Sequence, residues 1–167
     1  MKLLAIDPGT TQSAWCRIED GIPTQFGTLP NNVFRGVIRS AKTTECVIEM
    51  VACYGMPVGR EVFETAVWIG RFIETWNTNH VNDPHRIVRN DVKLTLCHSS
   101  RGVNDSVIRQ AIIDRFGGKD AAVGKKSKPG PLYGMKADEW QAFAVGLAWI
   151  DMQKSNPRVE IEVTNAD

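Results

Sequence analysis

The chain has 167 residues, of which 43% are hydrophobic and 23% are charged, and its net charge at pH 7 is +1. This length fits one domain, and the composition is that of an ordinary soluble globular protein. The sequence contains no apolar run of about 20 residues and no basic leader, so we expect neither a membrane span nor a signal peptide, and a cytoplasmic location. The four cysteines are widely spaced without a C-x-x-C pair, which argues against a zinc site or a disulfide framework.

Positive charge is concentrated in one part of the sequence. Residues 80–136 contain eleven Lys or Arg and five Asp residues, a net charge of +6, so the remainder of the chain is acidic. One basic region on a nearly neutral protein is typical of a partner that is a polyanion, such as nucleic acid. A solvated surface can have the same composition.

The first thirty residues predict a three-stranded antiparallel meander. A short apolar run at residues 2–7 ends at Pro8-Gly9, which indicates a buried strand followed by a turn. Residues 11–18 and 23–28 predict the second and third strands, because Asp20-Gly21 between them is a strong hairpin signal.

Helices and strands then alternate. Asn31 can cap a helix over 31–42, and the β-branched run 45–51 predicts a central strand. A long amphipathic helix over 58–76, a short strand at 86–88 and a brief helix follow. This order predicts an α/β fold with a mixed five-stranded sheet, an antiparallel meander followed by βαβ units, flanked by helices.

The last third of the chain predicts two helices separated by a loop. Residues 103–116 have a helical pattern, and 119–136 are rich in Gly, Pro and Lys and predict a loop. The final helix is expected over 137–150 and a polar tail over 151–167. One domain is therefore expected over residues 2–150.

Three carboxylates stand where this fold can bring them together. Asp7 ends the first strand after four apolar residues, and Glu49 lies inside the apolar run 47–51, where an unpaired carboxylate is costly. Asp138 opens the last helix. Two acids from neighbouring strands and one from a helix start offer hard oxygen ligands that suit Mg²⁺ or Mn²⁺. Two such ions can orient water and stabilise the leaving oxygen of a phosphodiester.

Each acid also has a structural explanation. Asp7 can cap the turn before Pro8-Gly9, and Glu49 can pair with a nearby Lys or Arg or lie on an exposed edge strand. Asp138 can serve as an N-cap, because a carboxylate is favourable at the positive end of the helix dipole. The hypothesis of a metal site therefore depends on the three acids converging.

Four segments resemble RuvC-type Holliday-junction resolvases, in the same order and over almost all of residues 2–150. They are LLAIDPGTTQSAWCRI, ECVIEMV, KLTLCHSSRGVNDSVIRQAIIDRF and KADEWQAFAVGLAW. The stretch PGPLYGMKADEW is most similar to resolvases of phages and prophages. The resemblance implies an RNase H-like nuclease that acts as a homodimer on four-way junctions or other branched DNA, without a nucleotide cofactor. Its hydrolytic nicks leave a 5′ phosphate and a 3′ hydroxyl.

The resemblance also implies a catalytic set and a cofactor. Asp7 and Glu49 match the first two catalytic acids of the family, and Asp138 matches the third. The fourth acid of the family corresponds to Gln141, a weaker ligand, so one or two Mg²⁺ ions are expected per site, with Mn²⁺ able to substitute. Glu139 is adjacent to Asp138, but neighbours on a helix point about 100° apart, so we do not expect it to be a direct ligand.

Several residues outside the acidic set are candidate DNA contacts. Lysines in the Gly- and Pro-rich stretch can hold phosphates without reading bases, although an ordinary solvated loop has the same composition. Residues just before the 103–116 helix are expected to reach the junction centre, and an aromatic after the strand of Glu49 can stack on an unpaired base. The candidates are Arg101, Asn104, Arg109, Lys125, Lys126, Lys128, Lys136 and Tyr54. Trp68, Phe72 and Trp76 follow each other at helical spacing and can form core or a dimer interface.

Three other functions are compatible with parts of the sequence. IDPGTT is similar to the phosphate loop of ATP-binding proteins of the actin and sugar-kinase group, but those proteins have two such domains and no second loop occurs here. Gln141 is compatible with a protein that binds junctions without cutting them. A related nuclease for replication forks or RNA–DNA hybrids would present the same acids to the same phosphates.

Overall fold

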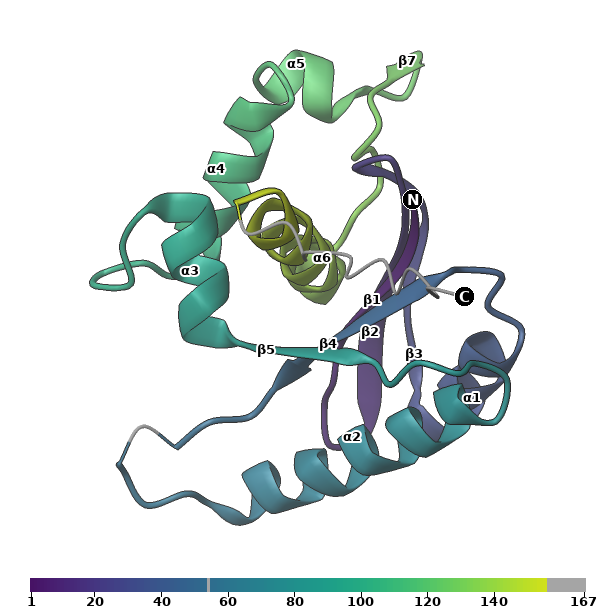
Figure 1. Ribbon diagram of the computed structural model, residues 1–167. Coiled ribbons are helices and arrows are strands. Elements are labelled where there is room, and N and C mark those ends of the chain that lie inside the picture. The colour runs from purple at the N-terminus through teal and green to yellow at the C-terminus, as the bar shows by residue number, and fades with distance from the viewer. Residues whose placement is uncertain (54, 156–167) are drawn as a thin grey trace, which may run out of the picture.

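A five-stranded sheet forms the centre of the molecule (Figure 1). The computed structural model describes residues 1–53 and 55–155. The strands are β1 (Lys2–Asp7), β2 (Gln12–Glu19), β3 (Ile22–Pro30), β4 (Glu45–Met50) and β5 (His85–Val88), in the spatial order β3-β2-β1-β4-β5. The first three strands pair antiparallel, whereas β4 pairs parallel with both β1 and β5. The predicted mixed α/β sheet is confirmed.

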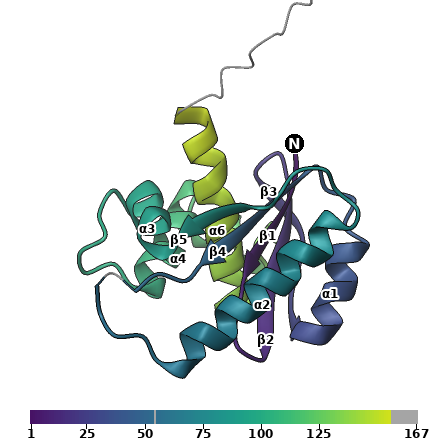
Figure 2. The same ribbon diagram turned by 60° about the horizontal axis from the view of Figure 1, so that its bottom comes forward.

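Helices cover both faces of this sheet (Figures 1 and 2). One face carries α1 (Asn31–Arg39) and α2 (Arg60–Asn77). The other carries α3 (Arg89–Cys97), α4 (Asp105–Arg115), the short α5 (Lys119–Ala122) and α6 (Ala137–Ser155). Within residues 1–53 and 55–155, no helix is long and apolar enough to cross a membrane.

Strand β1 supplies the centre of two separate hydrophobic cores. Its side chains alternate between the faces of the sheet, as every strand requires. Leu3 and Ala5 pack on the side of α6, and Leu4 and Ile6 pack on the side of α1 and α2. Because both faces are covered, all four side chains are completely buried.

Helix α6 lies directly on the sheet. It is buried along most of its length, as expected for a helix that is apolar on all sides. A glycine allows the close approach: a Cβ atom on Gly146 would lie 2.2 Å from Cδ1 of Ile18 and 2.9 Å from Cβ of Ala5. Real Cβ atoms essentially never show such distances, so α6 can lie this close to the sheet because residue 146 has no side chain.

Two local predictions from the sequence are wrong. Pro30, not Asn31, occupies the N-cap position of α1, and the Asn31 side chain is buried and bonded elsewhere. The stretch 119–136 is not a simple loop, because it contains α5 and a small hairpin of β6 (Gly124–Lys125) and β7 (Lys128–Pro129). The Gly, Pro and Lys residues of this stretch therefore occur in a short helix and a hairpin as well as in loops.

The end of the last helix also differs from the prediction. Helix α6 continues through residues 151–155, which were expected to belong to the tail, whereas residues 156–167 lie outside the described part.

On α2, Phe72 and Trp76 are core residues, and Trp68 packs on Phe72 at the edge of the same core. Phe72 and Trp76 therefore belong to the core, whereas Trp68 remains partly exposed.

The contact at Gly146 gives a direct test of the packing. Gly146→Ala should lower the free energy of unfolding, because overpacking costs about 1–3 kcal/mol, more than the roughly 0.5–1 kcal/mol that alanine gains over glycine inside a helix. Gly70→Ala on α2 is the matched control: its added Cβ would meet nothing within 4 Å, so it should be neutral or stabilising. Urea unfolding followed by circular dichroism measures both, and an equally stable Gly146→Ala would contradict the close approach.

Candidate active site

Asp7 is held at the carboxyl end of β1 by a closed set of hydrogen bonds around the turn that follows it. The Gly9 amide donates to the Ser13 hydroxyl at 3.2 Å, and that hydroxyl donates to Oδ1 of Asn31 at 2.7 Å. The Asn31 amide in turn donates to the Gly9 carbonyl at 2.9 Å. Ser13 and Asn31 are buried, so the bonds are shielded from water. They fix the direction in which the chain leaves Asp7.

Glu49 lies beside Asp7 on the neighbouring strand. Ile6 of β1 pairs with Ile48 of β4 in parallel register, so Asp7 and Glu49 follow next to each other at the same edge of the sheet. The strand alternation directs both toward the face covered by α6. Parallel strands of an α/β sheet place their sites at this carboxyl edge.

Asp7 stands where two hollows in the surface meet. One hollow, of about 200 Å³, is lined by Asp7, Glu49 and Arg89 together with the first residues after β4. The other, of about 360 Å³, is lined by Asp7, the turn after it and Asp138 at the start of α6. All three acids singled out in the sequence thus face one region, with Asp7 in the middle. In the described ranges, however, no three His, Cys, Asp or Glu side chains lie close enough to hold an ion as they stand.

Arg89 is the site residue that sequence reasoning missed. It is the first residue of α3, directly after β5, the strand beside β4. Its Nη1 donates to Oε2 of Glu49 at 3.3 Å, and its Nη2 donates to Oε1 of Gln141 at 2.5 Å and to Oδ1 of Asp105. The signal was present in the sequence, because Arg89 follows the carboxyl end of the last predicted strand.

Burial and crowding of like charges dominate the electrostatics of the site. Burial, reinforced by the Glu49 carboxylate, raises the pKa of Asp7 to about 8, and Arg89 offsets only part of this effect. The pKa of Glu49 is also raised by burial, with Arg89 opposing. A nearby cation would stabilise the ionised form of both carboxyl groups, and Arg89 alone does not supply enough positive charge to do so.

The three acids have the chemistry of a site for a hard divalent cation, but their side chains would have to move closer together to hold one. Asp7, Glu49 and Asp138 offer carboxylate oxygens around the two hollows, and the crowding at Asp7 is the kind that a bound cation relieves. The residues do not fit a second ion in the same way, because Oε1 of Gln141 already accepts a hydrogen bond from Arg89. Glu139 is not a free ligand either: it is buried, and its carboxylate accepts the Lys136 amide at 2.8 Å, as in a capping box.

The candidate DNA contacts on α4 and before it are largely engaged within the chain. Asn104 is the N-cap of α4, and its side chain accepts the Val107 amide at 3.1 Å. Arg109 lies over the ring of Trp140 at 4.7 Å from its centroid. Arg101 is exposed in the turn before α4.

The lysines are exposed but do not line the acidic hollows. Lys125, Lys126 and Lys128 lie on the β6–β7 hairpin, at the top of Figure 1 on the side of α4 and α5. Lys136 is exposed beside the start of α6. Tyr54 lies outside the described residues, so its proposed stacking role is not addressed by the structure.

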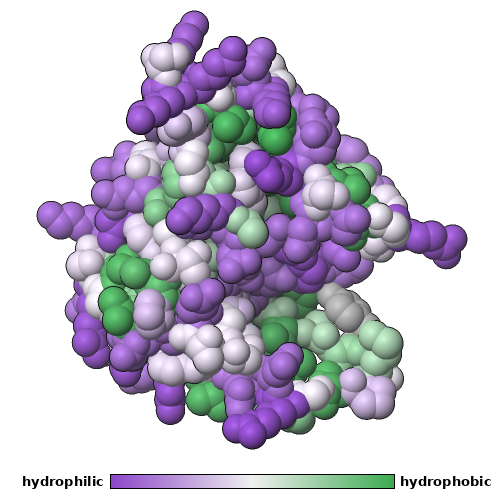
Figure 3. Space-filling view, turned by 180° about the vertical axis from the view of Figure 1, so that it is seen from behind, coloured by the Kyte–Doolittle hydropathy of each residue, from purple (hydrophilic) through white to green (hydrophobic). Residues whose placement is uncertain are grey.

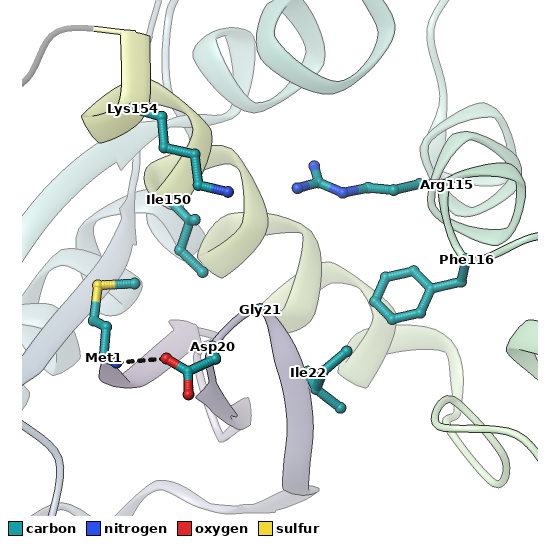
Figure 4. Close-up of a pocket in the computed structure, with 8 residues that line it drawn as sticks. All are labelled: Met1, Asp20, Gly21, Ile22, Arg115, Phe116, Ile150 and Lys154. Carbon is teal, nitrogen blue, oxygen red and sulfur yellow. Dashed lines mark hydrogen bonds and ion pairs between the residues drawn. The ribbon is translucent and has the colours of Figure 1, made fainter.

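A larger hollow at the opposite end of β1 is a separate feature (Figure 4). Arg115 and Lys154 point into it from two helices, with Phe116 nearby. The Arg115 guanidinium is already bonded to both carboxylate oxygens of Asp151, and the amino group of Met1 pairs with Asp20 at 2.7 Å. This hollow shares no residue with the acidic site.

Comparison with solved structures identifies the fold. A structure of RuvC from Thermus thermophilus superimposes with a TM-score of 0.65 at 11% identity, over 93% of this chain and 96% of that one. T. thermophilus RuvC in complex with a Holliday junction substrate gives a TM-score of 0.66 at 11% identity, over 93% and 97% of the two chains. No protein-family model and no curated protein matches the sequence. The chain therefore has the RuvC-like, RNase H-like fold that the sequence predicted.

The raised pKa of Asp7 predicts how stability depends on pH without metal. Below about pH 4 both folded and unfolded chains hold the proton, whereas between about pH 4 and 8 only the folded chain keeps it. The stabilisation is thus lost progressively between about pH 4 and pH 8, and in EDTA the wild type should lose several kcal/mol more than Asp7→Asn from pH 4 to 8.5. Urea unfolding across this range measures it, with Asp120→Asn, an exposed aspartate on α5, as the control that keeps the wild-type slope. Identical slopes for Asp7→Asn and wild type would contradict the prediction.

Proposed function

We propose that this protein is a Mg²⁺-dependent endonuclease that nicks four-way DNA junctions. The observation that carries the proposal is the pair of partly buried carboxylates, Asp7 and Glu49, on adjacent parallel strands with Asp138 bordering the same region. The RuvC-like fold supports it, since one similar protein was solved with a Holliday junction substrate. Asp7, Glu49 and Asp138 are the proposed catalytic and metal-holding residues.

In this proposal the chain's own groups hold and orient the reactants. Asp7, Glu49 and Asp138 hold Mg²⁺, with Mn²⁺ able to substitute, and the bound ion supplies activation of water and stabilisation of developing charge on the phosphate. The bonded turn around Gly9 keeps Asp7 in place, and Arg89 orients Glu49. Hydrolysis leaves a 5′ phosphate and a 3′ hydroxyl.

The proposal includes a homodimer. The largest apolar side chains on the outside of α2 are Phe63 and Val67, which are 63% and 54% exposed, and Met56 in the preceding loop is 68% exposed. Figure 3 shows apolar side chains gathered at the lower right, over the start of α2 and this loop. Light scattering of the purified chain decides the proposal, and a molar mass of one chain at micromolar concentration would count against it.

A second candidate is a protein that binds junctions without cutting them. The contact between Arg89 and Gln141 favours it, because it occupies the amide that replaces the fourth acid of RuvC-type enzymes. A nucleotide-binding function has less support. The Gly9 amide, which a phosphate loop would offer to a nucleotide, donates to Ser13 instead.

The deciding experiment incubates the chain with a synthetic mobile four-way junction, with Mg²⁺ or EDTA, beside linear duplex, fork and RNA–DNA hybrid. Asp7→Asn and Glu49→Gln should each reduce nicking by at least about 10²–10³-fold and keep junction binding in EDTA, because they remove ligands but not the DNA surface. Glu45→Gln, the same change at the other end of β4, should keep nicking. Binding without Mg²⁺-dependent nicking by the wild type would favour the second candidate, and full activity in both acid variants would refute the site.

The β6–β7 hairpin is proposed as a phosphate-binding surface. Changing Lys125, Lys126 and Lys128 together to Gln should weaken junction binding and reduce its salt dependence, because each lost phosphate contact lowers the slope of log K against log salt by about 0.9. Fluorescence anisotropy over a salt series measures both quantities.

The matched control changes three cations on the other side of the sheet. Arg39, Lys42 and Arg71 are exposed on or beside α1 and α2, away from the hairpin. Their change to Gln should leave the slope as in the wild type. Equal slopes for the hairpin variant and the wild type would remove the hairpin from the DNA footprint.

A further inference from the structure

Arg89 connects three elements at the active site. Its guanidinium contacts Glu49 of β4, Gln141 of α6 and Asp105 of α4. Its side chain is only 23% exposed, and that of Glu49 is 15% exposed, so the pair is largely shielded from water. The guanidinium is also anchored from its own backbone, because Arg89 begins α3 directly after β5.

The Arg89 guanidinium lies against the side chain of Gln141. Gln141 lies three residues after Asp138 on α6, so both project from the same side of the helix. A carboxylate at residue 141 would complete a second group of acidic ligands with Glu49 and Asp138. The chain instead has a neutral amide there, and its oxygen accepts a hydrogen bond from Arg89 at 2.5 Å.

A guanidinium and a divalent cation do not share such a position. Arg carries a permanent charge that no accessible pH removes, so the two cations would repel each other at close range in a poorly solvated site. An arginine side chain can, however, take the place of a metal ion, because its planar guanidinium is positively charged and donates hydrogen bonds to several oxygens at once. The Arg89 guanidinium and one bound ion are then available to balance the acids, and Lys93 also favours the charged form of Glu49.

We propose that the Arg89 guanidinium takes the place of a second metal ion, so that each active site uses one divalent cation. This inference rests on the proposed nuclease function and deepens it. Arg89 acts as a positioning residue: it holds Glu49 and Gln141 and supplies positive charge that stays in place when Mg²⁺ is scarce. The single ion would lie on the side of Asp7 and Asp138, where no cationic side chain among residues 1–53 and 55–155 lines the hollow.

The test is the number of Mn²⁺ ions bound per chain, measured from the electron paramagnetic resonance signal of free Mn²⁺ during titration of the full chain. The wild type should bind one ion. The double variant Arg89→Gln with Gln141→Asp should bind two, because it removes the guanidinium and supplies the missing carboxylate. The rate of junction nicking should follow the first power of Mg²⁺ concentration in the wild type and approach the second power in the double variant.

Two matched variants separate charge from folding. Gln141→Asp alone keeps Arg89 with its contacts to Glu49 and Asp105, so it should still bind one ion. Arg89→Lys with Gln141→Asp keeps a cation and should also bind one. Two ions in the wild type or in Gln141→Asp alone would overturn the proposal, and so would one ion in a double variant that is folded by circular dichroism.

The outcomes distinguish this inference from the proposed function. A wild type that binds one Mn²⁺ but nicks no branched DNA would confirm the ion count and refute the nuclease. A wild type that nicks junctions and binds two ions would do the opposite.

Discussion

The repulsion between two carboxylates at the end of adjacent parallel strands is the constraint around which the rest of the site is arranged. Asp7 and Glu49 are placed side by side by the register of β1 and β4, and burial deprives both of water. A sheet gains nothing from such an arrangement, because an uncompensated charge at the edge of a core destabilises the fold. The hydrogen-bonded turn after Asp7 and the contact between Arg89 and Glu49 stabilise this unfavourable arrangement.

In the proposed site, the negative charge of these acids is balanced by Arg89 and by a bound ion. Arg89 is built into the chain directly after β5, whereas the proposed metal ion would lie beside Asp7, where burial and Glu49 raise the carboxyl pKa. Dividing the charge in this way explains how the chain can have an amide at residue 141 and still have a coherent acidic site. It also separates the two hollows, since Arg89 lines one and Asp138 lines the other.

Features that depend on local pattern could be predicted from the sequence, and features that depend on distant contacts could not. The alternation of Leu3 to Ile6 and the placement of Asp7 and Glu49 follow from strand periodicity, and the mixed sheet followed from the sequence of elements. The position of Arg89 directly after a predicted strand was visible in the sequence, but its bonds to residues 40 and 52 positions away are encoded by no local pattern. Asn31 has the chemistry of an N-cap, but its side chain serves the turn after Asp7, so tertiary hydrogen bonding overrode the local preference.

The seating of α6 against the sheet has a consequence for how the core can change over time. Asp138 and Gln141 lie at one end of this helix, about 12 and 8 Å along its axis from Gly146, if each residue rises about 1.5 Å. Because Ala5 and Ile18 already lie so close to Gly146, a larger side chain at either position would displace the helix that carries both polar groups. The packing at Gly146 therefore helps to fix where Asp138 and Gln141 lie, although neither Ala5 nor Ile18 lines the acidic hollows.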